Sequence, residues 1–179
     1  FGGSLATNAG GPGACKYGMT RAWVLSLEAL MADGEVHRFG IGTVKQNSGP
    51  ALAQLLVGSE GIFGLIVAAT VRLIPEPRER LTLLLPVADW QGLLDLPVAL
   101  VTAGLLPAAF EFWDPAVLEL LRRHGPEEAR RLPGEALALL EFDDPGCTSD
   151  PFLNRVLEAL GPAGEHLQSA TETRQREAL

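Results

Sequence analysis

A short proline-rich connector constrains this chain more than any other feature of its sequence. Residues 74–77 read Ile-Pro-Glu-Pro. Each proline fixes φ and lacks a backbone N–H, and it disfavours helical geometry in the residue before it, so neither a helix nor a central strand can cross the stretch. We therefore expect two units, residues 1–77 and residues 78–179.

Downstream of the connector, short apolar strands alternate with helices. Asp114 before Pro115 has the residue types of a helix N-cap followed by the first helical position. Strand–helix units with short connections favour a small α+β sandwich, ferredoxin-like or a variant of it. The apolar patterns predict strands at 81–86, 108–113 and 136–142, and helices at 90–102, 116–124, 151–160 and 170–179.

Upstream of the connector, glycine is frequent and the loops are long. Residues 23–32 and 35–39 flank Asp33-Gly34, which predicts a β-hairpin with a two-residue type I′ turn. A short helix is expected at 51–57 and a strand at 65–73, where the side chains alternate between two faces.

The opening segment, Gly2–Gly11, is the most unusual stretch. Its four glycines carry an entropic cost, and they allow backbone N–H groups to approach an anionic ligand closely. Ser4, Thr7 and Asn8 add short polar side chains, which suit a pyrophosphate or the polar edge of a flavin. The alternative is a tight surface loop with Asn8 in the left-handed region. The segment lacks the strand and helix context of a Rossmann fingerprint and the Gly-Lys-Ser/Thr ending of a P-loop.

A second glycine segment, Gly58–Gly64, lies between the expected helix at 51–57 and the expected strand at 65–73. Its three glycines free main-chain groups at this junction. Glu60 is its one carboxylate, and it either caps N–H groups within the loop or has a role at a ligand. Two such segments in one unit favour a ligand site over two unrelated loops.

Composition excludes several classes of protein. The net charge of −8 argues against a nucleic-acid partner, since phosphate binding needs a basic surface. No apolar run reaches the roughly 20 residues of a membrane span. Cys15 and Cys147 are far apart and have no metal-site spacing, which favours reduced thiols in a cytoplasmic protein.

Other residues with reactive or aromatic side chains receive ordinary structural interpretations. The three histidines, His37, His124 and His166, are isolated in the sequence and are expected at surface or structural positions. We assign no catalytic residue and no metal ligand. The aromatic residues Trp90, Phe110, Phe112 and Trp113 are expected in a core rather than a pocket, and Arg122, Arg123, Arg130 and Arg131 on a solvated face.

Taken together, these motifs resemble the FAD-linked oxidases, whose FAD-binding domain is of the vanillyl-alcohol oxidase type. The residues that carry the resemblance include both glycine segments, Lys16-Tyr17-Gly18, Arg21, the Asp33-Gly34 hairpin, Lys45, Gly49 and the strand ending Arg72-Leu73-Ile74-Pro75. The subgroup is that of the D-lactate dehydrogenases and the glycolate oxidase flavin subunit. The match is strong over residues 1–77 and weaker beyond.

The resemblance implies an α+β architecture. Residues 1–77 would form the second half of a two-part FAD-binding domain, and residues 78–179 part of a ferredoxin-like cap domain on the substrate side. FAD is the implied cofactor. By correspondence with the family's motifs, the residues at or near FAD would be Gly3, Ser4, Thr7, Asn8, Gly10, Gly11, Gly58, Ser59, Glu60, Gly61, Gly64 and Ile66.

The implied activity is oxidation of a small 2-hydroxy acid, such as glycolate or D-lactate, by hydride transfer to FAD. Electrons would leave to a separate acceptor or to other oxidase subunits. The sequence departs from the family at Gly49-Pro50-Ala51, where Gly-Tyr-Asp is usual, and it lacks the family's first glycine-rich loop and its histidine motif. The chain therefore looks like a piece of a larger enzyme. A non-catalytic FAD-binding or assembly subunit is the alternative.

Overall fold

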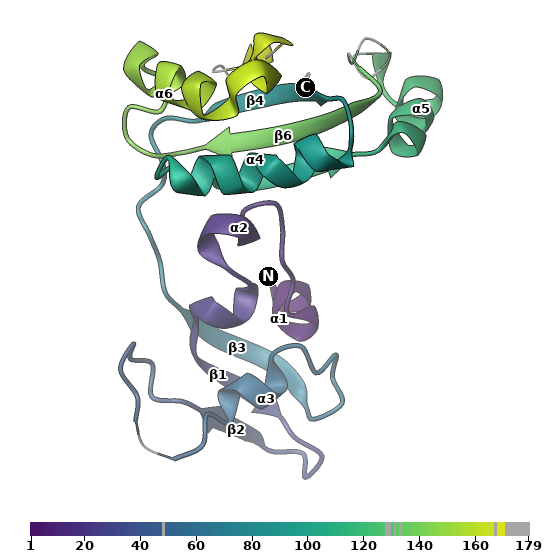
Figure 1. The fold of residues 1–179 in the computed structure, drawn as a ribbon. Coiled ribbons are helices and arrows are strands. Elements are labelled where there is room, and N and C mark those ends of the chain that lie inside the picture. The colour runs from purple at the N-terminus through teal and green to yellow at the C-terminus, as the bar shows by residue number, and fades with distance from the viewer. Residues whose placement is uncertain (48, 128–129, 131, 133, 167, 171–179) are drawn as a thin grey trace. The chain divides into compact units, whose positions relative to one another are not determined.

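The computed structural model describes residues 1–47, 49–127, 130, 132, 134–166 and 168–170. The chain is a mixed α+β protein with two compact units, Phe1–Pro75 and Glu76–Leu179 (Figure 1). The division falls inside the proline-rich connector. Among the described residues, no helix is long and apolar enough to cross a membrane.

The first unit has a three-stranded antiparallel sheet in the order β2-β1-β3, with short helices beside it (Figure 1). Its small core includes Leu5, Leu27, Ala29, Leu56 and Val57. The elements are α1 (Gly2–Thr7), α2 (Ala14–Tyr17), the 3-10 helix η1 (Thr20–Trp23), β1 (Val24–Leu30), β2 (Val36–Phe39), α3 (Ala53–Leu56) and β3 (Leu65–Val71).

The β1–β2 hairpin forms as predicted, but its turn is of another type. The Met31 N–H donates to the Glu35 carbonyl (2.9 Å), and the Gly34 N–H donates to the Met31 carbonyl (3.0 Å). Only Gly34, at φ 84°, is left-handed in this turn, so a three-residue loop replaces the expected type I′ turn. The reason lies in Asp33: its Oδ1 accepts the Glu35 N–H (2.9 Å), a local bond that Asp forms without a positive φ.

The second unit has a ferredoxin-like sheet, which confirms the expected architecture. Its strands are β4 (Leu81–Val87), β5 (Ala109–Trp113), β6 (Ala136–Phe142) and β7 (Gln168–Ala170), and its helices are α4 (Trp90–Thr102), α5 (Pro115–His124), α6 (Asp150–Leu160) and the 3-10 helix η3 (Gly161–His166). The strand order is β5-β6-β4-β7, and each neighbouring pair is antiparallel. The chain thus follows β-α-β-β-α-β order, with α5 inserted between β5 and β6 (Figure 1).

The core of this unit lies between one sheet face and helices α4 and α6. Alternate residues of β4, such as Leu83 and Leu85, meet Leu96 and Leu100 of α4 and Val156 of α6. Side chains at alternate strand positions share one face, so the strand period alone directs these leucines to the helices.

Helix starts in this unit are set by short acceptor side chains. Asp89 Oδ1 accepts the Gly92 N–H (2.8 Å) at α4, and Asp114 Oδ1 accepts the Val117 N–H (2.7 Å) at α5. The N-cap predicted at Asp114 is confirmed. The helix expected at 170–179 lies outside the described residues apart from Ala170, which ends β7 instead.

Candidate functional site

The first glycine segment is largely helical, contrary to the loop that its glycines predicted. Gly2–Thr7 forms α1, and the Thr7 hydroxyl donates to the Gly3 carbonyl (3.0 Å) within that helix. Asn8 ends the helix in the left-handed conformation (φ 50°), as expected. The Asn8 and Ala9 N–H groups donate to the carbonyls of Leu5 (3.3 Å) and Ser4 (2.9 Å). Burial of Leu5 in the core offsets the low helix propensity of the glycines.

The second glycine segment is bonded directly to the first. The Gly58 N–H donates to the Leu5 carbonyl, and the Glu60 N–H donates to the Ala6 carbonyl, both at 2.9 Å. The Leu5 carbonyl, which also accepts the Asn8 N–H, thereby gains a second donor, and the Ala6 carbonyl near the end of α1 gains a partner from the second segment. Two motifs that are distant in sequence therefore form one continuous piece of backbone structure.

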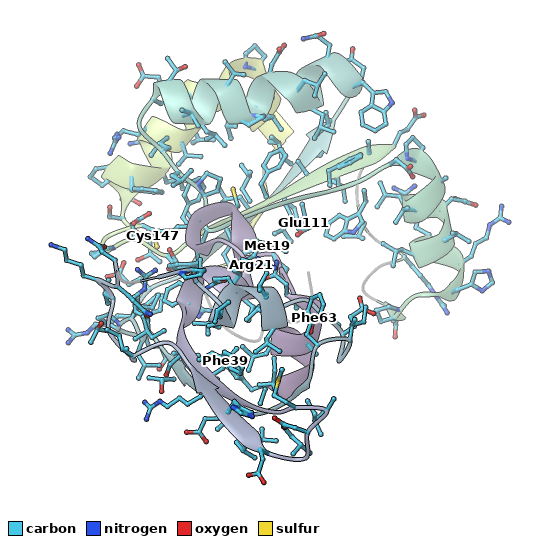
Figure 2. All side chains as sticks on the ribbon, turned by 90° about the horizontal axis from the view of Figure 1, so that it is seen from below. Met19, Arg21, Phe39, Phe63, Glu111 and Cys147 are labelled. Carbon is cyan, nitrogen blue, oxygen red and sulfur yellow. The ribbon has the colours of Figure 1, made fainter. Side chains whose placement is uncertain are left out.

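Arg21 holds the two segments together. Its backbone N–H donates to Asn8 Oδ1 (2.9 Å), and its Nη2 donates to the Val57 carbonyl (2.7 Å), just before the second segment. Thr20, its neighbour, donates to the Ala9 carbonyl from both its N–H (3.1 Å) and its hydroxyl (2.7 Å). Arg21, with Met19 two residues before it, can be followed in Figure 2. Arg21 belongs to the resemblance but was not among the predicted site residues, because its partners are remote in sequence.

A side chain at Gly58 would be both strained in its backbone and crowded by its neighbours. It has φ 81°, and a Cβ placed there would lie 3.0 Å from Asn8 Cβ and 3.4 Å from Arg21 Nη2. Glu60 also adopts a left-handed conformation, at φ 52°. Gly61 has φ 88° with open space around it. The loop is thus shaped partly by strained backbone and partly by close contact with Asn8.

Of the other residues predicted to be at or near FAD, some lie in this site and some support the surrounding fold. Gly10 packs against the end of the Met19 side chain, which would have to shift to admit a Cβ, and the Gly11 carbonyl accepts the Ala14 N–H (2.9 Å). Gly64 and Ile66 pack against the sheet and the core of the first unit. A Cβ on Gly64 would lie 2.8 Å from Met31 Sδ, and Ile66 packs against the unit's core. Gly3 and Ser4, within α1, are exposed and half-buried respectively.

A buried hydroxyl group in the second segment lacks a protein partner. Ser59 is 7% exposed, and its Oγ makes no hydrogen bond to the described protein. Burying a polar atom without a partner costs about 1–3 kcal/mol, so such an atom points to a missing ligand or water contact. With the glycine backbone around it, Ser59 fits a polar cofactor such as FAD.

A pocket of about 620 Å³ lies in the same unit, beside Arg21. Its lining includes Arg21, Arg72, Thr43 and the loop carrying Ala51. Arg72 lies over the Trp23 ring, 4.5 Å from its centre. Gln54 also lines the pocket, and its buried Oε1 lacks a partner among the described residues. Two arginine residues along one concave site suit an anionic ligand.

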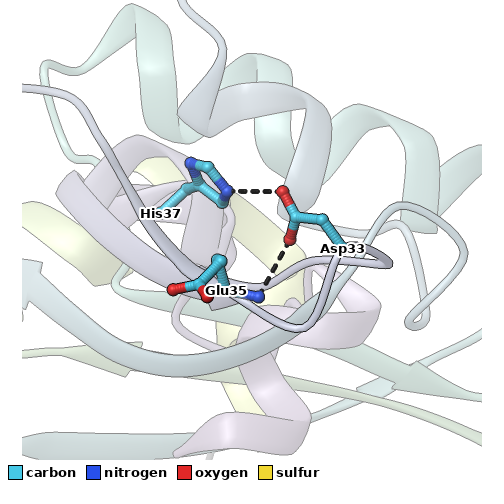
Figure 3. Close-up of polar contacts among 3 residues, drawn as sticks. All are labelled: Asp33, Glu35 and His37. Atoms are coloured by element: carbon cyan, nitrogen blue, oxygen red, sulfur yellow. Dashed lines mark hydrogen bonds and ion pairs between the residues drawn. The ribbon is translucent and has the colours of Figure 1, made fainter.

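His37 and His124 lie at exposed positions, as predicted. The His37 Nε2 lies 2.8 Å from Asp33 Oδ2 across the exposed hairpin (Figure 3). The Glu35 N–H, and then the His37 ring, hold the pKa of the Asp33 carboxyl below its usual value. Among the described residues, no three His, Cys, Asp or Glu side chains are grouped to hold a metal ion.

In the second unit, two expectations about side chains are wrong. Trp90 is 62% exposed and lines a pocket of about 260 Å³ together with Phe112, whereas Phe110 packs against the core as expected. Arg122 is not merely solvated, since its Nη2 donates to the carbonyls of Leu132 (2.9 Å) and Gly134. Arg131 lies outside the described residues.

Comparisons with known proteins agree with the arrangement. A family model described as an FAD binding domain matches residues 1–40, and one described as the C-terminal domain of FAD linked oxidases matches residues 76–179. A D-lactate dehydrogenase of Archaeoglobus fulgidus is 41% identical over 79% of this chain and 32% of its own length. The glycolate oxidase subunit GlcD of Bacillus subtilis is 31% identical over 100% of this chain and 38% of its own.

A D-2-hydroxyglutarate dehydrogenase of Xanthomonas citri pv. viticola is 37% identical over 71% of this chain and 27% of its own length. The chain thus spans about a third of the length of these relatives. Among solved structures, an alkyldihydroxyacetonephosphate synthase has a TM-score of 0.66 over 99% of this chain and 35% of its own, at 19% identity, which shows a shared fold. Because one FAD-oxidase model matches more than half of the chain and an FAD-binding model matches its opening residues, the chain belongs to the FAD-linked oxidases, an oxidoreductase family whose cofactor is FAD.

Proposed function

We propose that the protein containing this chain uses FAD to oxidise a small 2-hydroxy acid. The observation that carries the proposal is the shared chemistry in the names of three relatives at 31–41% identity: D-lactate, glycolate and D-2-hydroxyglutarate are all 2-hydroxy acids. Bound FAD would accept a hydride from the carbon bearing the hydroxyl group, and a separate acceptor or another oxidase subunit would take up the electrons. We propose a cytoplasmic enzyme, in keeping with its free cysteines Cys15 and Cys147.

In this proposal residues 1–77 are part of the FAD-binding domain and residues 78–179 part of the cap. Ser59 would hydrogen-bond a polar atom of FAD, since its hydroxyl is buried and has no hydrogen-bond partner among the described residues. Asn8 and Gly58 would fix the backbone that cradles the cofactor. Gly64 and Ile66 would support the loop from β3. The full proposed set is Gly3, Ser4, Thr7, Asn8, Gly10, Gly11, Gly58, Ser59, Glu60, Gly61, Gly64 and Ile66.

The pocket beside Arg21 and Arg72 would receive an anionic part of the ligand. Ala51 lines it at a position where the family usually has Asp. Without that carboxylate, the two arginine residues of the lining gain no acidic partner from this position. This substitution is also the observation that favours the alternative function, a non-catalytic FAD-binding or assembly subunit.

The first test uses the protein purified from its natural source. Reduction of an artificial electron-accepting dye is measured with D-lactate, glycolate and D-2-hydroxyglutarate, with L-lactate and L-2-hydroxyglutarate as controls for the two chiral acids. Reduction with one or more of these acids and with bound flavin supports the proposal. Bound flavin without turnover of any 2-hydroxy acid supports the alternative subunit, and a flavin-free protein contradicts both.

The role of Ser59 is tested in the same protein by Ser59→Ala. Loss of one hydrogen bond should weaken FAD binding by roughly fivefold to tenfold, which corresponds to about 1 kcal/mol. Stability of the flavin-free protein should not fall, because the substitution removes a buried atom that lacks a partner. Ser26→Ala, another buried serine but outside the glycine segments, is the matched control. Equal FAD affinity in both variants would contradict a direct role for Ser59.

A further inference from the structure

The second glycine segment begins inside a type II turn. Val57 has φ −70° and ψ 120°, Gly58 has φ 81°, and the Ser59 N–H donates to the Leu56 carbonyl (3.2 Å). A type I turn closes the same hydrogen bond and differs by a flip of the central peptide, here the one between Val57 and Gly58. Because glycine adopts positive and negative φ, the residues of the turn admit both types.

Two hydrogen bonds from outside the turn select the orientation of this central peptide. On one side its carbonyl, that of Val57, accepts Arg21 Nη2 (2.7 Å). On the other side its N–H, that of Gly58, donates to the Leu5 carbonyl (2.9 Å). A flip would break both bonds and turn the Val57 oxygen toward the Leu5 oxygen. Arg21 supplies a charged donor, whose hydrogen bond is stronger than one between neutral groups.

The orientation of the central peptide affects how Ser59 is held. Ser59 lies between two N–H groups, those of Gly58 and Glu60, and both donate to carbonyls of α1. A flip of the peptide before Gly58 would release the first of these attachments. The Ser59 hydroxyl is buried and has no hydrogen-bond partner among the described residues, so no side-chain hydrogen bond there helps to place it.

The surroundings of Arg21 keep its guanidinium at the turn. The Arg21 N–H donates to Asn8 Oδ1 (2.9 Å), which fixes the backbone of Arg21 against the end of the first glycine segment. A Cβ at position 58 would lie 3.4 Å from Arg21 Nη2, so glycine leaves room for the guanidinium there. All of these contacts lie within the first unit.

We propose that Arg21 is a positioning residue for FAD. It holds the Val57–Gly58 peptide in the type II orientation and thereby places the Ser59 hydroxyl against the cofactor. This inference rests on the proposed hydrogen bond between Ser59 and FAD. Because Arg21 acts through the peptide, its effect on FAD affinity requires Ser59. A charge that only attracted an anionic ligand would act with or without the Ser59 hydroxyl.

A double-mutant cycle in the full-length protein containing this chain measures this dependence. FAD is removed and titrated back, and flavin fluorescence gives the affinity. Arg21→Met should weaken FAD binding by roughly tenfold on its own, but by less than about threefold in a Ser59→Ala background. Arg38→Met removes an exposed arginine of the same unit and is the matched control, with a loss of less than about twofold in either background.

Arg21→Lys separates the hydrogen bond from the charge. Lysine keeps the positive charge, but its ammonium group lies one bond closer to the backbone than Nη2 and lacks the planar fork. It should therefore restore only part of the affinity that Arg21→Met loses. Circular dichroism establishes folding of each variant. Should Arg21→Met fail to fold, Arg21→Lys completes the same cycle, with a loss of roughly threefold that disappears in the Ser59→Ala background.

Four results would overturn the proposal. The first is a loss in Arg21→Met that is equal with and without Ser59→Ala, since Arg21 would then contact the ligand itself or only stabilise the unit. The second is full affinity in Arg21→Lys, since the charge alone would then suffice. The third is unchanged affinity in Arg21→Met while Ser59→Ala binds FAD more weakly, which leaves the proposed function intact. The fourth is unchanged affinity in Ser59→Ala, which removes the contact on which both proposals rest.

Discussion

Replacing Gly58 with alanine tests whether the two glycine segments form one structure. Gly58 and Gly61 have similar left-handed backbone geometry, at φ 81° and φ 88°. An alanine held in that region costs roughly 1–2 kcal/mol at either position. Only at Gly58 does the new methyl group also meet Asn8 Cβ at 3.0 Å and Arg21 Nη2 at 3.4 Å, whereas Gly61 faces open space.

We therefore expect unequal losses of stability in the first unit. Crowding against the first segment adds about 1 kcal/mol or more. The free energy of unfolding should fall by about 2–3 kcal/mol in Gly58→Ala and by about 1–2 kcal/mol in Gly61→Ala, the matched control.

Urea unfolding measures the difference. The chain has three tryptophans, of which only Trp23 lies in the first unit. In a background with Trp90→Phe and Trp113→Phe, its fluorescence reports that unit alone, and linear extrapolation gives each free energy. Equal losses in Gly58→Ala and Gly61→Ala would refute the contact between the segments.

Four further expectations follow from the same contacts. Leu140→Ala, at a fully buried position, should destabilise the second unit by about 2–5 kcal/mol, whereas Leu94→Ala, at an exposed position of α4, should change its stability by less than about 0.5 kcal/mol. Urea unfolding in a Trp23→Phe background, where Trp90 and Trp113 report the second unit, measures both. Asn8→Gly and Asn8→Ala both remove the acceptor for the Arg21 N–H, but only glycine adopts φ 50° without strain. The Asn8→Gly variant should therefore be more stable than Asn8→Ala by about 1 kcal/mol, and the reverse order would contradict the left-handed cap. NMR titration should place the pKa of Asp33 below its usual value, and His37→Ala should raise that pKa only partly, because the Glu35 N–H is the larger cause. The stability that this carboxylate gives to the hairpin should be present above the ordinary pKa of Asp and should be lost as the pH falls through the lower pKa of the folded state. Iodoacetamide should modify the exposed Cys15 readily. It should modify the buried Cys147, whose pKa is raised by desolvation, only when the protein unfolds. Mass spectrometry after timed quenching measures both rates of modification, and equal rates would contradict this expectation.

Much of the second unit could be predicted because its signals are local. The alternation in β6 places every second residue toward the helices, and Asp114-Pro115 carries both an N-cap and a first helical position. The type predicted for the turn at Asp33-Gly34 was wrong. The Asp33 carboxylate accepts a hydrogen bond from the Glu35 N–H, and Asp33 does not adopt the positive φ that a type I′ turn requires.

The first unit was harder because its structure depends on distant residues. Glycines argue against a helix at Gly2–Thr7, yet Leu5 is buried and the N–H groups of Gly58 and Glu60 complete the helix end. The role of Arg21 could not be found from spacing, since its acceptor is the carbonyl of Val57. Trp90 was expected in a core because composition does not show which face of a helix lacks a partner.

Native mass spectrometry of the protein from its natural source tests the central claim most directly. The account predicts one FAD per polypeptide, released on denaturation and bound less tightly in the Ser59→Ala and Gly58→Ala variants than in Ser26→Ala. A natural protein that folds without bound FAD, and that loses no more stability in Gly58→Ala than in Gly61→Ala, would contradict it.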